Sequence, residues 1–522
     1  MALTARHRWT ALGVLCLAVL LVGIDNTIVN VALPSISGQL SAGTSGLQWV
    51  VDAYTLVFAG LLLGFGHLGD RFGRRRTLLV GIAGFGAVSI VAATAGTLGV
   101  LIGARAVMGG FAALIYPATL ALLTNIFTDA RERVAAVGLW SAVTGVSVAV
   151  GPVTGGWLLE HFSWGSVFWV NLPMAFIALA ATARFVPESR DPHVGRLDWL
   201  GVVLSISGIS LLVWAVIEGP HRGWSTPLEL AAFAGAAVLL AGFIGWERRC
   251  ASPVLDVRLF GNRRFSAAAG AISIAFFGLF GFIFLITQYF QVVKGYSTLS
   301  AGVRTLPFAI VIGVLAPIAV QLAQRFGSTV VVAGGLALMS AGFGLASTTA
   351  ADSAYWGKII VAMVLMAAGL GLLTGPATES IMGALPRDQA GAGSAVNDTT
   401  RELGGTLGVA VLGSILAAIY RSHLTPALHT AGLSDQLQAR ALSSVTGGFQ
   451  VASGSGSPAL MHSVQTAFVE GVNRASLVAA LACLLGAVLV AVALPARART
   501  SGNGAVQAEA DGHERGAELL VA

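Results

Sequence analysis

Long apolar blocks alternate with short polar connections along this chain. Fourteen blocks of about 20 residues carry few charges. A helix satisfies all of its own backbone hydrogen bonds, and about 20 helical residues cross a hydrocarbon core roughly 30 Å thick, so each block predicts a transmembrane helix. The predicted spans are 10–31, 48–68, 77–95, 98–123, 133–158, 166–186, 199–217, 228–246, 266–290, 303–323, 329–347, 356–380, 400–420 and 473–494. The chain is therefore predicted to be an all-α polytopic membrane protein.

The composition agrees with this pattern. Of the 522 residues, 56% are hydrophobic and 10% are charged, and the mean hydropathy is +0.81. A soluble domain of this length could not bury so much apolar surface. The first block starts near residue 10 and lacks a small-residue cleavage site, so we interpret it as a span rather than a removed signal peptide. Three cysteines, two of them inside spans, exclude a disulfide framework.

The basic residues indicate the orientation of the spans. Cytoplasmic loops of membrane proteins are enriched in Lys and Arg, and most of the 30 in this chain fall on the side that holds both termini. Those on the other side are Arg222, Lys294, Arg304, Lys358, Arg421, Arg440 and Arg474. Both termini are therefore expected in the cytoplasm. The net charge of +6 is expected to anchor the protein in the lipid bilayer rather than to bind nucleic acid.

The expected organisation is two six-helix halves with two extra central helices. Residues 1–190 form the first bundle, 191–262 hold the inserted pair with its cytoplasmic loops, 263–494 form the second bundle, and 495–522 form a disordered cytoplasmic tail. No internal association motif stands out, so a functional monomer is expected.

The second bundle contains one long external loop, residues 421–472. It is rich in Gly, Ser, Ala and His. Residues 433–445 are expected to form a surface helix, whereas 447–458, with their glycines and serines, are expected to be flexible. The loop shows no candidate chemistry.

The connection between the second and third spans carries the most specific motif. Residues 66–76 read Gly-His-Leu-Gly-Asp-Arg-Phe-Gly-Arg-Arg-Arg. This stretch resembles the cytoplasmic gate motif of the major facilitator superfamily, with glycine at position 69 where alanine is usual. The matching positions are Gly66, Gly69, Asp70, Arg71, Gly73 and Arg74. In that family the glycines let two helices approach closely, while the aspartate pairs with the arginines or with a neighbouring helix end.

The fifth span carries a second resemblance. Superfamily members usually have twelve spans, and fourteen are typical of the drug:proton antiporter branch. The fifth span is similar to a motif that marks antiporters within the superfamily. The matching positions are Gly145, Gly151, Pro152, Gly155 and Gly156. Proline removes a backbone hydrogen bond and kinks the helix, while the glycines let neighbouring helices slide against it. The motif lies near the external end of the span, so it predicts a hinge that closes the external gate; a merely structural kink is the alternative.

Two charged residues in the first half are candidates for proton coupling. Asp25 lies in a stretch that looks like a motif of fourteen-span multidrug exporters, and Arg105 lies in one that resembles the fourth-span motif of the family. A carboxylate in hydrocarbon costs roughly 2.5–3.5 kcal/mol and therefore usually serves a function. Burial disfavours its charged form and an arginine favours it, so movement of Arg105 can switch its protonation. The alternative is a structural pair.

Three further carboxylates are candidates for binding a cationic substrate. At roughly 1.5 Å per residue, Asp52 lies at the same depth as Asp25 and Arg105. Asp398 and Glu402 are four residues apart near the start of the thirteenth span, with Arg401 beside them, and so share a helix face. Related exporters use acidic residues of this segment for cation recognition. The alternative for this pair is a polar cluster at the cytoplasmic surface.

The sequence lacks the motifs of several other function classes. It contains no phosphate-binding loop, and its two lysines lie in no such setting. It has no metal-binding motif, no paired Cys-x-x-Cys and no hydrolase nucleophile motif. We therefore expect neither an enzyme nor a cofactor or metal, and we do not expect ATP to be the energy source.

The combined pattern favours a proton-coupled antiporter. Such a protein is expected to export hydrophobic, cationic drugs or toxic compounds across the plasma membrane of a bacterium by alternating access. A dedicated exporter of an endogenous antibiotic, siderophore or lipid is an alternative with the same fold. A nutrient importer driven by proton symport is a further alternative, which the Gly151-Pro152 hinge disfavours.

Overall fold

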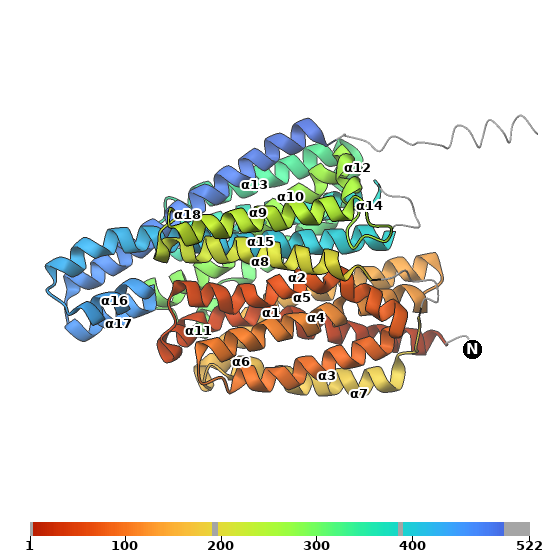
Figure 1. Cartoon of the computed structure of the whole chain (residues 1–522), viewed down its shortest axis with the longest axis horizontal. Coiled ribbons are helices and arrows are strands. Elements are labelled where there is room, and N and C mark those ends of the chain that lie inside the picture. The colour runs from red at the N-terminus through yellow and green to blue at the C-terminus, as the bar shows by residue number, and fades with distance from the viewer. Residues whose placement is uncertain (1–3, 191–196, 385–389, 495–522) are drawn as a thin grey trace, which may run out of the picture.

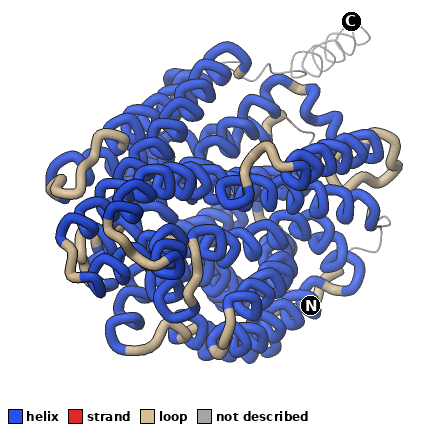
Figure 2. The backbone as a smooth tube through the Cα atoms, turned by 60° about the vertical axis from the view of Figure 1, so that its left-hand side comes forward, coloured by secondary structure: helices blue, strands red, loops and turns tan. Residues whose placement is uncertain are grey.

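The computed structural model describes residues 4–190, 197–384 and 390–494, and this part of the chain is built from helices joined by short connections (Figure 2). The first half comprises α1 (Ala5–Leu40), α2 (Thr44–Phe72), α3 (Arg74–Ala93), α4 (Leu98–Ile126), α5 (Ala130–His161), α6 (Ser166–Trp169) and α7 (Asn171–Phe185). The inserted pair is α8 (Trp199–Arg222) and α9 (Pro227–Glu247). The second half comprises η1 (Val257–Gly261), α10 (Arg263–Gln288), η2 (Tyr289–Val293), α11 (Thr298–Val303), α12 (Leu306–Phe326), α13 (Ser328–Ala346), η3 (Tyr355–Ile359), α14 (Ile360–Met382), α15 (Ala390–Thr430), α16 (Asp435–Ser443), α17 (Val445–Ser455) and α18 (Pro458–Ala493). The tail expected at 495–522 lies outside the described residues.

The predicted number of membrane spans is confirmed. The described residues form 14 helices that are long and apolar enough to cross a bilayer, four of which combine two consecutive elements: α6 with α7, α10 with η2, α11 with α12, and η3 with α14. Many helices begin with a polar cap. The side chain of Asp129, for example, accepts hydrogen bonds from the backbone of Arg131 and Glu132 at the start of α5. The apolar blocks thus set the number of spans, and polar residues at their edges satisfy the free backbone groups.

The spans form an elongated bundle with two different ends (Figure 1). We call the end from which α16 and α17 project the hairpin end. The opposite end, which holds the α2–α3 connection with Arg74, Arg75 and Arg76, is the arginine end. The described chain begins and finishes at the arginine end, with α1 and α18. Within the bundle, α8 packs against both α2 and α15, so the inserted pair lies along a seam between the two halves.

The long loop expected at 421–472 is instead mostly helical. α15 continues to Thr430, α16 confirms the expected helix at 433–445, and α17 occupies most of the segment that was expected to be flexible. The glycines of α17 explain the error. A side chain at Gly448 would collide with Tyr420, whose hydroxyl donates a 3.0 Å hydrogen bond to the carbonyl of Ala441. These glycines therefore allow tight packing, and the expectation of flexibility was wrong.

Glycines bring the same pair of helices together in each half. In the first half, Gly155 of α5 lies against Ile28 of α1. In the second half, Gly404 and Gly408 of α15 lie against the backbone of α10. Small residues at such crossings let helix backbones approach closely, which substitutes for the hydrophobic driving force that lipid does not provide. This repetition supports the division into two related halves.

Candidate proton and substrate sites

A buried ion pair joins α1 to α4. Asp25 lies in the second half of α1 and Arg105 in the second turn of α4, and both side chains are fully buried. The Arg105 Nη1 donates a 2.5 Å hydrogen bond to Asp25 Oδ2. On the other side, Asn171 Nδ2 of α7 donates to Asp25 Oδ1 at 2.8 Å and to the hydroxyl of Ser89 at 3.3 Å. Three helices, α1, α4 and α7, therefore meet at one carboxylate, and α3 supports Asn171 from behind.

The arginine of this pair is itself held in place by α2. Its Nε donates a 3.0 Å hydrogen bond to the carbonyl of Val50, and its guanidinium lies 4.2 Å from the centre of the Tyr54 ring. Cations are attracted to the faces of aromatic rings, most strongly where water is excluded. Removal of one partner of a buried ion pair typically costs about 3–5 kcal/mol, because the other charge is left unpaired. We call Asp25, Arg105 and Asn171 the sealed cluster.

Asp52 lies in the seam between α2 and α15. Its side chain is fully buried, and neither carboxylate oxygen has a hydrogen-bond partner in the described structure. Polar contacts between the two halves lie on either side of it along α2. Gln48 donates to the carbonyl of Val409 at 3.0 Å, and Thr406 donates to Thr55 at 2.9 Å. A substrate cannot reach Asp52 in this conformation, so its expected contact with a cation stays a prediction for another state.

A row of aromatic side chains leads from the sealed cluster toward the arginine end. The ring centres of Tyr54 and Phe58 are 6.0 Å apart, those of Phe58 and Tyr116 are 5.9 Å apart, and those of Tyr116 and Trp140 are 5.1 Å apart. These separations are typical of interacting aromatic pairs. The row therefore runs from α2 through α4 to α5.

The second candidate site lies on α15. Arg401 Nη1 is 3.8 Å from Asp398 Oδ1, and the Asn397 amide donates to the same oxygen at 3.2 Å. Glu402 has one buried oxygen without a partner. The side chains of Asp398 and Arg401 retain 17% and 23% of their exposure, so this group is only partly sealed. We call Asp398, Arg401 and Glu402 the open cluster.

The open cluster is not at a helix start. α15 begins at Ala390, about ten residues before the predicted span, so Asp398 lies in the third turn of the helix. The corresponding candidate span begins at Val396, four residues before the predicted start at residue 400. The alternative, a polar cluster at the cytoplasmic surface, therefore stays open.

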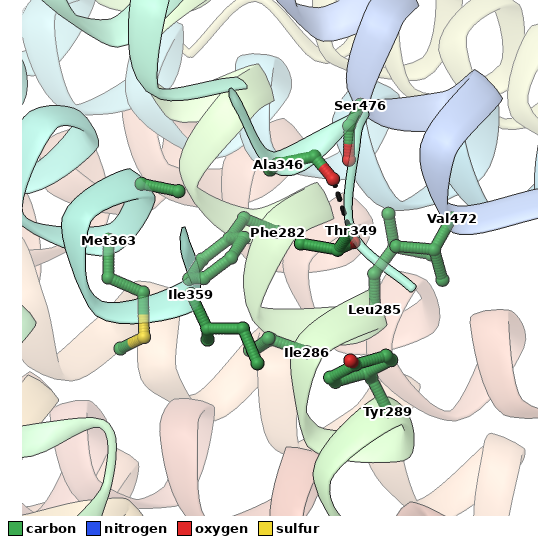
Figure 3. Close-up of a pocket in the computed structure, with 11 residues that line it drawn as sticks. Phe282, Leu285, Ile286, Tyr289, Ala346, Thr349, Ile359, Met363, Val472 and Ser476 are labelled. Atoms are coloured by element: carbon green, nitrogen blue, oxygen red, sulfur yellow. Dashed lines mark hydrogen bonds between the residues drawn. The ribbon is translucent and has the colours of Figure 1, made fainter. Parts of the chain in front are cut away.

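Two apolar cavities lie beside these sites. The interface cavity lies between the halves and is lined by Thr27, Val148, Pro152, Phe282, Ile283, Ile286, Thr287, Thr305, Phe308, Ala309 and Met363. The C-half cavity is lined by Phe282, Leu285, Ile286, Tyr289, Ala346, Thr349, Ile359, Ala362, Met363, Val472 and Ser476 (Figure 3). The two share three lining residues. Hydrophobic and aromatic walls with few polar groups are typical of sites for apolar organic ligands.

The antiporter motif on α5 contacts both halves. Side chains at Gly151 and Gly155 would collide with Thr27 and Ile28 of α1, the second of these at 2.6 Å. A side chain at Gly156 would come within 2.5 Å of the Thr298 carbonyl on α11, which belongs to the other half. The Thr298 hydroxyl in turn donates a 2.8 Å hydrogen bond to the Gly156 carbonyl. The motif therefore forms part of the contact that joins the halves at the hairpin end.

The first glycine of the motif differs from the other three. Gly145 is exposed, and a side chain there would meet nothing within 4 Å. Its expected place in the hinge has no packing contact to support it in this conformation. Pro152 lies inside the helix as expected, and its carbonyl faces Gly302 at the end of α11.

The arginine-rich motif forms a network at the arginine end. Arg74 Nε donates a 2.7 Å hydrogen bond to Asp70, and the backbone nitrogen of Arg75 donates to Glu188 at 3.0 Å. Gly73 has a φ of +111°, which favours glycine, and a side chain there would also press on Glu188. The motif thus ties the α2–α3 connection to the segment that follows α7.

The other positions of this motif make looser contacts. Side chains at Gly66 and Gly69 would lie 3.7 Å and 3.9 Å from their nearest neighbours, which is ordinary van der Waals contact. Arg71 is exposed and stacks on the ring of Phe72. Close approach of helices therefore depends on neither Gly66 nor Gly69 in this conformation.

The sequence analysis missed Asn171 of the sealed cluster and Tyr54, which lies beside the cluster. Asn171 and Tyr54 lie in apolar spans and match no motif that we used. A signal was available for Asn171, because an amide inside a span usually has a polar partner within the bundle. Tyr54 had no such signal, since aromatic residues are common in spans.

Comparison with known proteins identifies the family. A model of the Major Facilitator Superfamily matches residues 15–409. The chain is 40% identical over 493 residues to the multidrug efflux pump LfrA of Mycolicibacterium smegmatis, which covers 94% of this chain and 97% of LfrA. It is 36% identical over 450 residues to the methyl viologen resistance protein SmvA of Salmonella typhimurium, which covers 85% of this chain and 89% of SmvA.

A solved structure shares the fold. The crystal structure of a bacterial homolog to the human lysosomal transporter Spinster, in an inward-facing and unoccupied conformation, superimposes with a TM-score of 0.66 over 94% of this chain and 98% of that one. The identity is 18%, so this likeness concerns the fold alone. Together with the fourteen spans, the two related halves and the motifs on α2 and α5, these findings show that the chain belongs to the Major Facilitator Superfamily.

Proposed function

We propose that the protein is a proton-coupled antiporter that exports hydrophobic, cationic compounds across the plasma membrane of a bacterium. The observation that carries the proposal is the sealed cluster, an ionisable carboxylate held by an arginine and an asparagine within the membrane-spanning helices. Such a group is costly in hydrocarbon and is best explained by a role in the transport cycle. The names of the relatives LfrA and SmvA, an efflux pump and a resistance protein, support the direction of transport.

We assign the arginine end to the cytoplasm. Most of the arginines lie there, including the network of Asp70 and Arg74, and positive charge is retained on the cytoplasmic side during membrane insertion. The hairpin end then faces outward. The protein is proposed to act as a monomer, since each chain contains both halves and both clusters.

Alternating access requires the contacts between the halves to break at one end at a time. At the hairpin end, Thr298 bonds to Gly156 at 2.8 Å, Gln291 donates to the Val31 carbonyl at 2.9 Å, and the Ser37 and Ser444 hydroxyls are 3.1 Å apart. This conformation is therefore closed toward the outside. Export would proceed when these contacts open and cargo leaves at the hairpin end.

The two clusters suit two different cargoes. The sealed cluster admits no molecule larger than a proton, because both of its charged side chains are fully buried. The open cluster retains exposure and carries two carboxylates against one arginine, so it can attract an organic cation. The row from Tyr54 to Trp140, which is largely buried in this conformation, would offer aromatic surface to the same cargo once the halves separate. Methyl viologen, in the name of SmvA, is such a cation.

Transport into everted membrane vesicles tests this proposal. Each elementary charge moved is worth about 2.3 kcal/mol per 100 mV, and each pH unit about 1.4 kcal/mol, so one or two protons can support large concentration ratios. We expect a cationic dye to accumulate when a proton gradient is imposed, with or without ATP, and a protonophore to stop its accumulation. Undiminished transport after collapse of the gradient would overturn the proposal.

The glycines of the antiporter motif on α5 provide a structural test of alternating access. Gly155→Leu places a bulky side chain against Ile28 and should reduce transport strongly while the protein is still inserted. Gly145→Leu is the matched control on the same helix, because nothing lies within 4 Å of that position. The measurement is dye transport per inserted protein. Equal losses in the two variants would remove the special role of the α1–α5 crossing.

A further inference from the structure

An arginine fills an aromatic cage at the hairpin end of the second half. The Arg304 guanidinium lies 4.0 Å from the centre of the Tyr296 ring and 5.4 Å from that of Tyr355. Phe290 packs against both of these rings, with its ring centre 5.8 Å from that of Tyr296 and 6.0 Å from that of Tyr355. Phe290 and Tyr355 are buried, so two of the three rings are largely withdrawn from solvent.

The arginine depends on the rings rather than on an acidic partner. Among the described residues, no carboxylate lies within ion-pair distance of Arg304. Its Nη1 donates to the carbonyl and hydroxyl of Ser300, and its Nε is buried without a partner. The neighbouring cation Lys294 donates to the carbonyls of Ala351 and Ser353 and is thereby held on the connection before η3. The cage is thus a built site for one cation.

The cage adjoins both apolar cavities. Tyr289 lines the C-half cavity, and the next residue, Phe290, is a wall of the cage. Thr305 lines the interface cavity and directly follows Arg304. The cage therefore lies between the cavities and the end of the bundle that we assign to the outside.

Arg304, which fills the cage, is linked through α11 to the antiporter motif of α5. Arg304 directly follows α11, whose Gly302 faces the Pro152 carbonyl of the antiporter motif. The Tyr355 hydroxyl donates a 2.8 Å hydrogen bond to the Arg304 carbonyl, so the junction of α11 and α12 is bound to η3. Separation of α5 from α11 would pull on this junction and on the guanidinium in the cage.

We propose that Phe290, Tyr296 and Tyr355 form an exit site for organic cations, in which the Arg304 guanidinium takes the place of the cargo while the outer gate is closed. The inference rests on the proposed export of cations. Ring faces bind quaternary ammonium groups and guanidinium through the same electrostatic attraction, which is strongest where water is excluded. An outgoing cation would displace Arg304 as α11 moves, and the return of the arginine would expel it.

Equilibrium dialysis with radiolabelled choline tests the site directly. Arg304→Ala empties the cage, so the purified full-length variant should bind about one choline per chain more than the wild type. The neutral isostere 3,3-dimethylbutan-1-ol should not compete. The double variant Arg304→Ala with Tyr296→Leu should bind this choline about tenfold more weakly or worse. No gain in binding for the single variant, or a gain that survives loss of the Tyr296 ring, would overturn the site.

A second measurement keeps Arg304 and decides the matter if Arg304→Ala does not give a monodisperse protein. Tyr296→Phe retains the ring, and Tyr296→Leu removes it. We expect the leucine variant to export a permanently charged dye several-fold more slowly than a neutral compound, relative to wild type, and the phenylalanine variant to match wild type for both. Equal effects on both compounds, or none, would show that the cage only fixes the junction of α11 and α12.

These two experiments distinguish failure of the exit site from failure of the proposed antiporter function. Choline binding in detergent needs no gradient, so it can succeed even if transport proves independent of protons. Conversely, proton-dependent export with no choline binding by the emptied cage would leave the antiporter intact and overturn the exit site alone.

Discussion

The sealed cluster and the open cluster each pair an aspartate with an arginine, but they differ in how close that pair is and how far it is buried. In the first half, Asp25 is paired at 2.5 Å, supported by Asn171, and fully buried. In the second half, Asp398 lies 3.8 Å from Arg401, and both keep part of their exposure. A tight buried pair responds to the gain or loss of a proton, whereas a loose, partly exposed group can rearrange around a larger ion.

This difference follows from the supporting helices. The sealed cluster is enclosed by α1, α4, α7 and the α2 backbone, because Arg105 bonds to Val50 and Asn171 reaches Asp25 from α7. The open cluster is carried by α15 alone, and among the described residues its arginine contacts Thr378 of α14 and the ring of Phe276 of α10 on other helices. A carboxylate with fewer enclosing partners retains unsatisfied capacity, as Glu402 shows. The variants below test whether this structural contrast is also a functional one.

The largest effect is expected for Asp25→Asn. Asparagine keeps the size of the side chain but cannot carry a proton, so proton-driven export of both charged and neutral compounds should fall to the background of vesicles without the protein. Asp435→Asn, an exposed carboxylate on α16, is the control. The measurement is gradient-driven uptake by everted vesicles, normalised to inserted protein. Wild-type export with an unchanged pH dependence would show that Asp25 has a structural role, and the two clusters would then not differ in function as proposed.

The next effect concerns the support of the sealed cluster. Asn171→Ala removes a hydrogen bond to an ionisable group, worth about 1.5–3 kcal/mol, which corresponds to one or two pH units in proton affinity. We expect the pH optimum of export to move by about that amount while much of the maximal rate is kept. Ser89→Ala, which removes only the 3.3 Å contact behind Asn171, should change the optimum much less. An unchanged pH profile in Asn171→Ala would show that Arg105 alone tunes the site.

A smaller and selective effect is expected in the open cluster. Asp398→Asn and Glu402→Gln each remove one charge that faces a cation, at a cost of about one or two kcal/mol, or a factor of 5–30 in affinity. Export of a permanently charged dye should fall by about this factor, and that of a neutral compound should stay within about twofold. The measurement is efflux of a matched pair of compounds in each variant. Equal losses for the two would assign these carboxylates to coupling or folding.

The smallest effect is expected for Asp52→Asn. The carboxylate is buried without a partner in the closed conformation, so a neutral amide of the same size should fit the seam between α2 and α15. If Asp52 meets substrate when the seam opens, export of charged dyes should weaken slightly more than that of neutral compounds. A loss as complete as that of Asp25→Asn would instead make Asp52 part of the proton pathway and blur the distinction drawn here.

Several features were determined by the sequence alone. The fourteen spans follow from apolar blocks of fixed length, because the thickness of the hydrocarbon core sets how many helical residues are needed. The pairing of Asp25 with Arg105 was also predictable. A constant rise per residue places both side chains at the same depth, and opposite charges within the hydrocarbon core usually pair with each other. The antiporter glycines were located by their spacing on one helix.

Only the tertiary structure decided which polar groups are enclosed and by what. It buried Asp52, brought Asn171 to Asp25 from a helix 146 residues away, and placed Arg304 against two rings, Tyr296 and Tyr355, from separate segments. It also turned the glycines of α17 into packing contacts rather than flexible points. The physical reason is that depth and periodicity specify the height and face of a residue on its own helix, whereas enclosure depends on which other helices pack against that face.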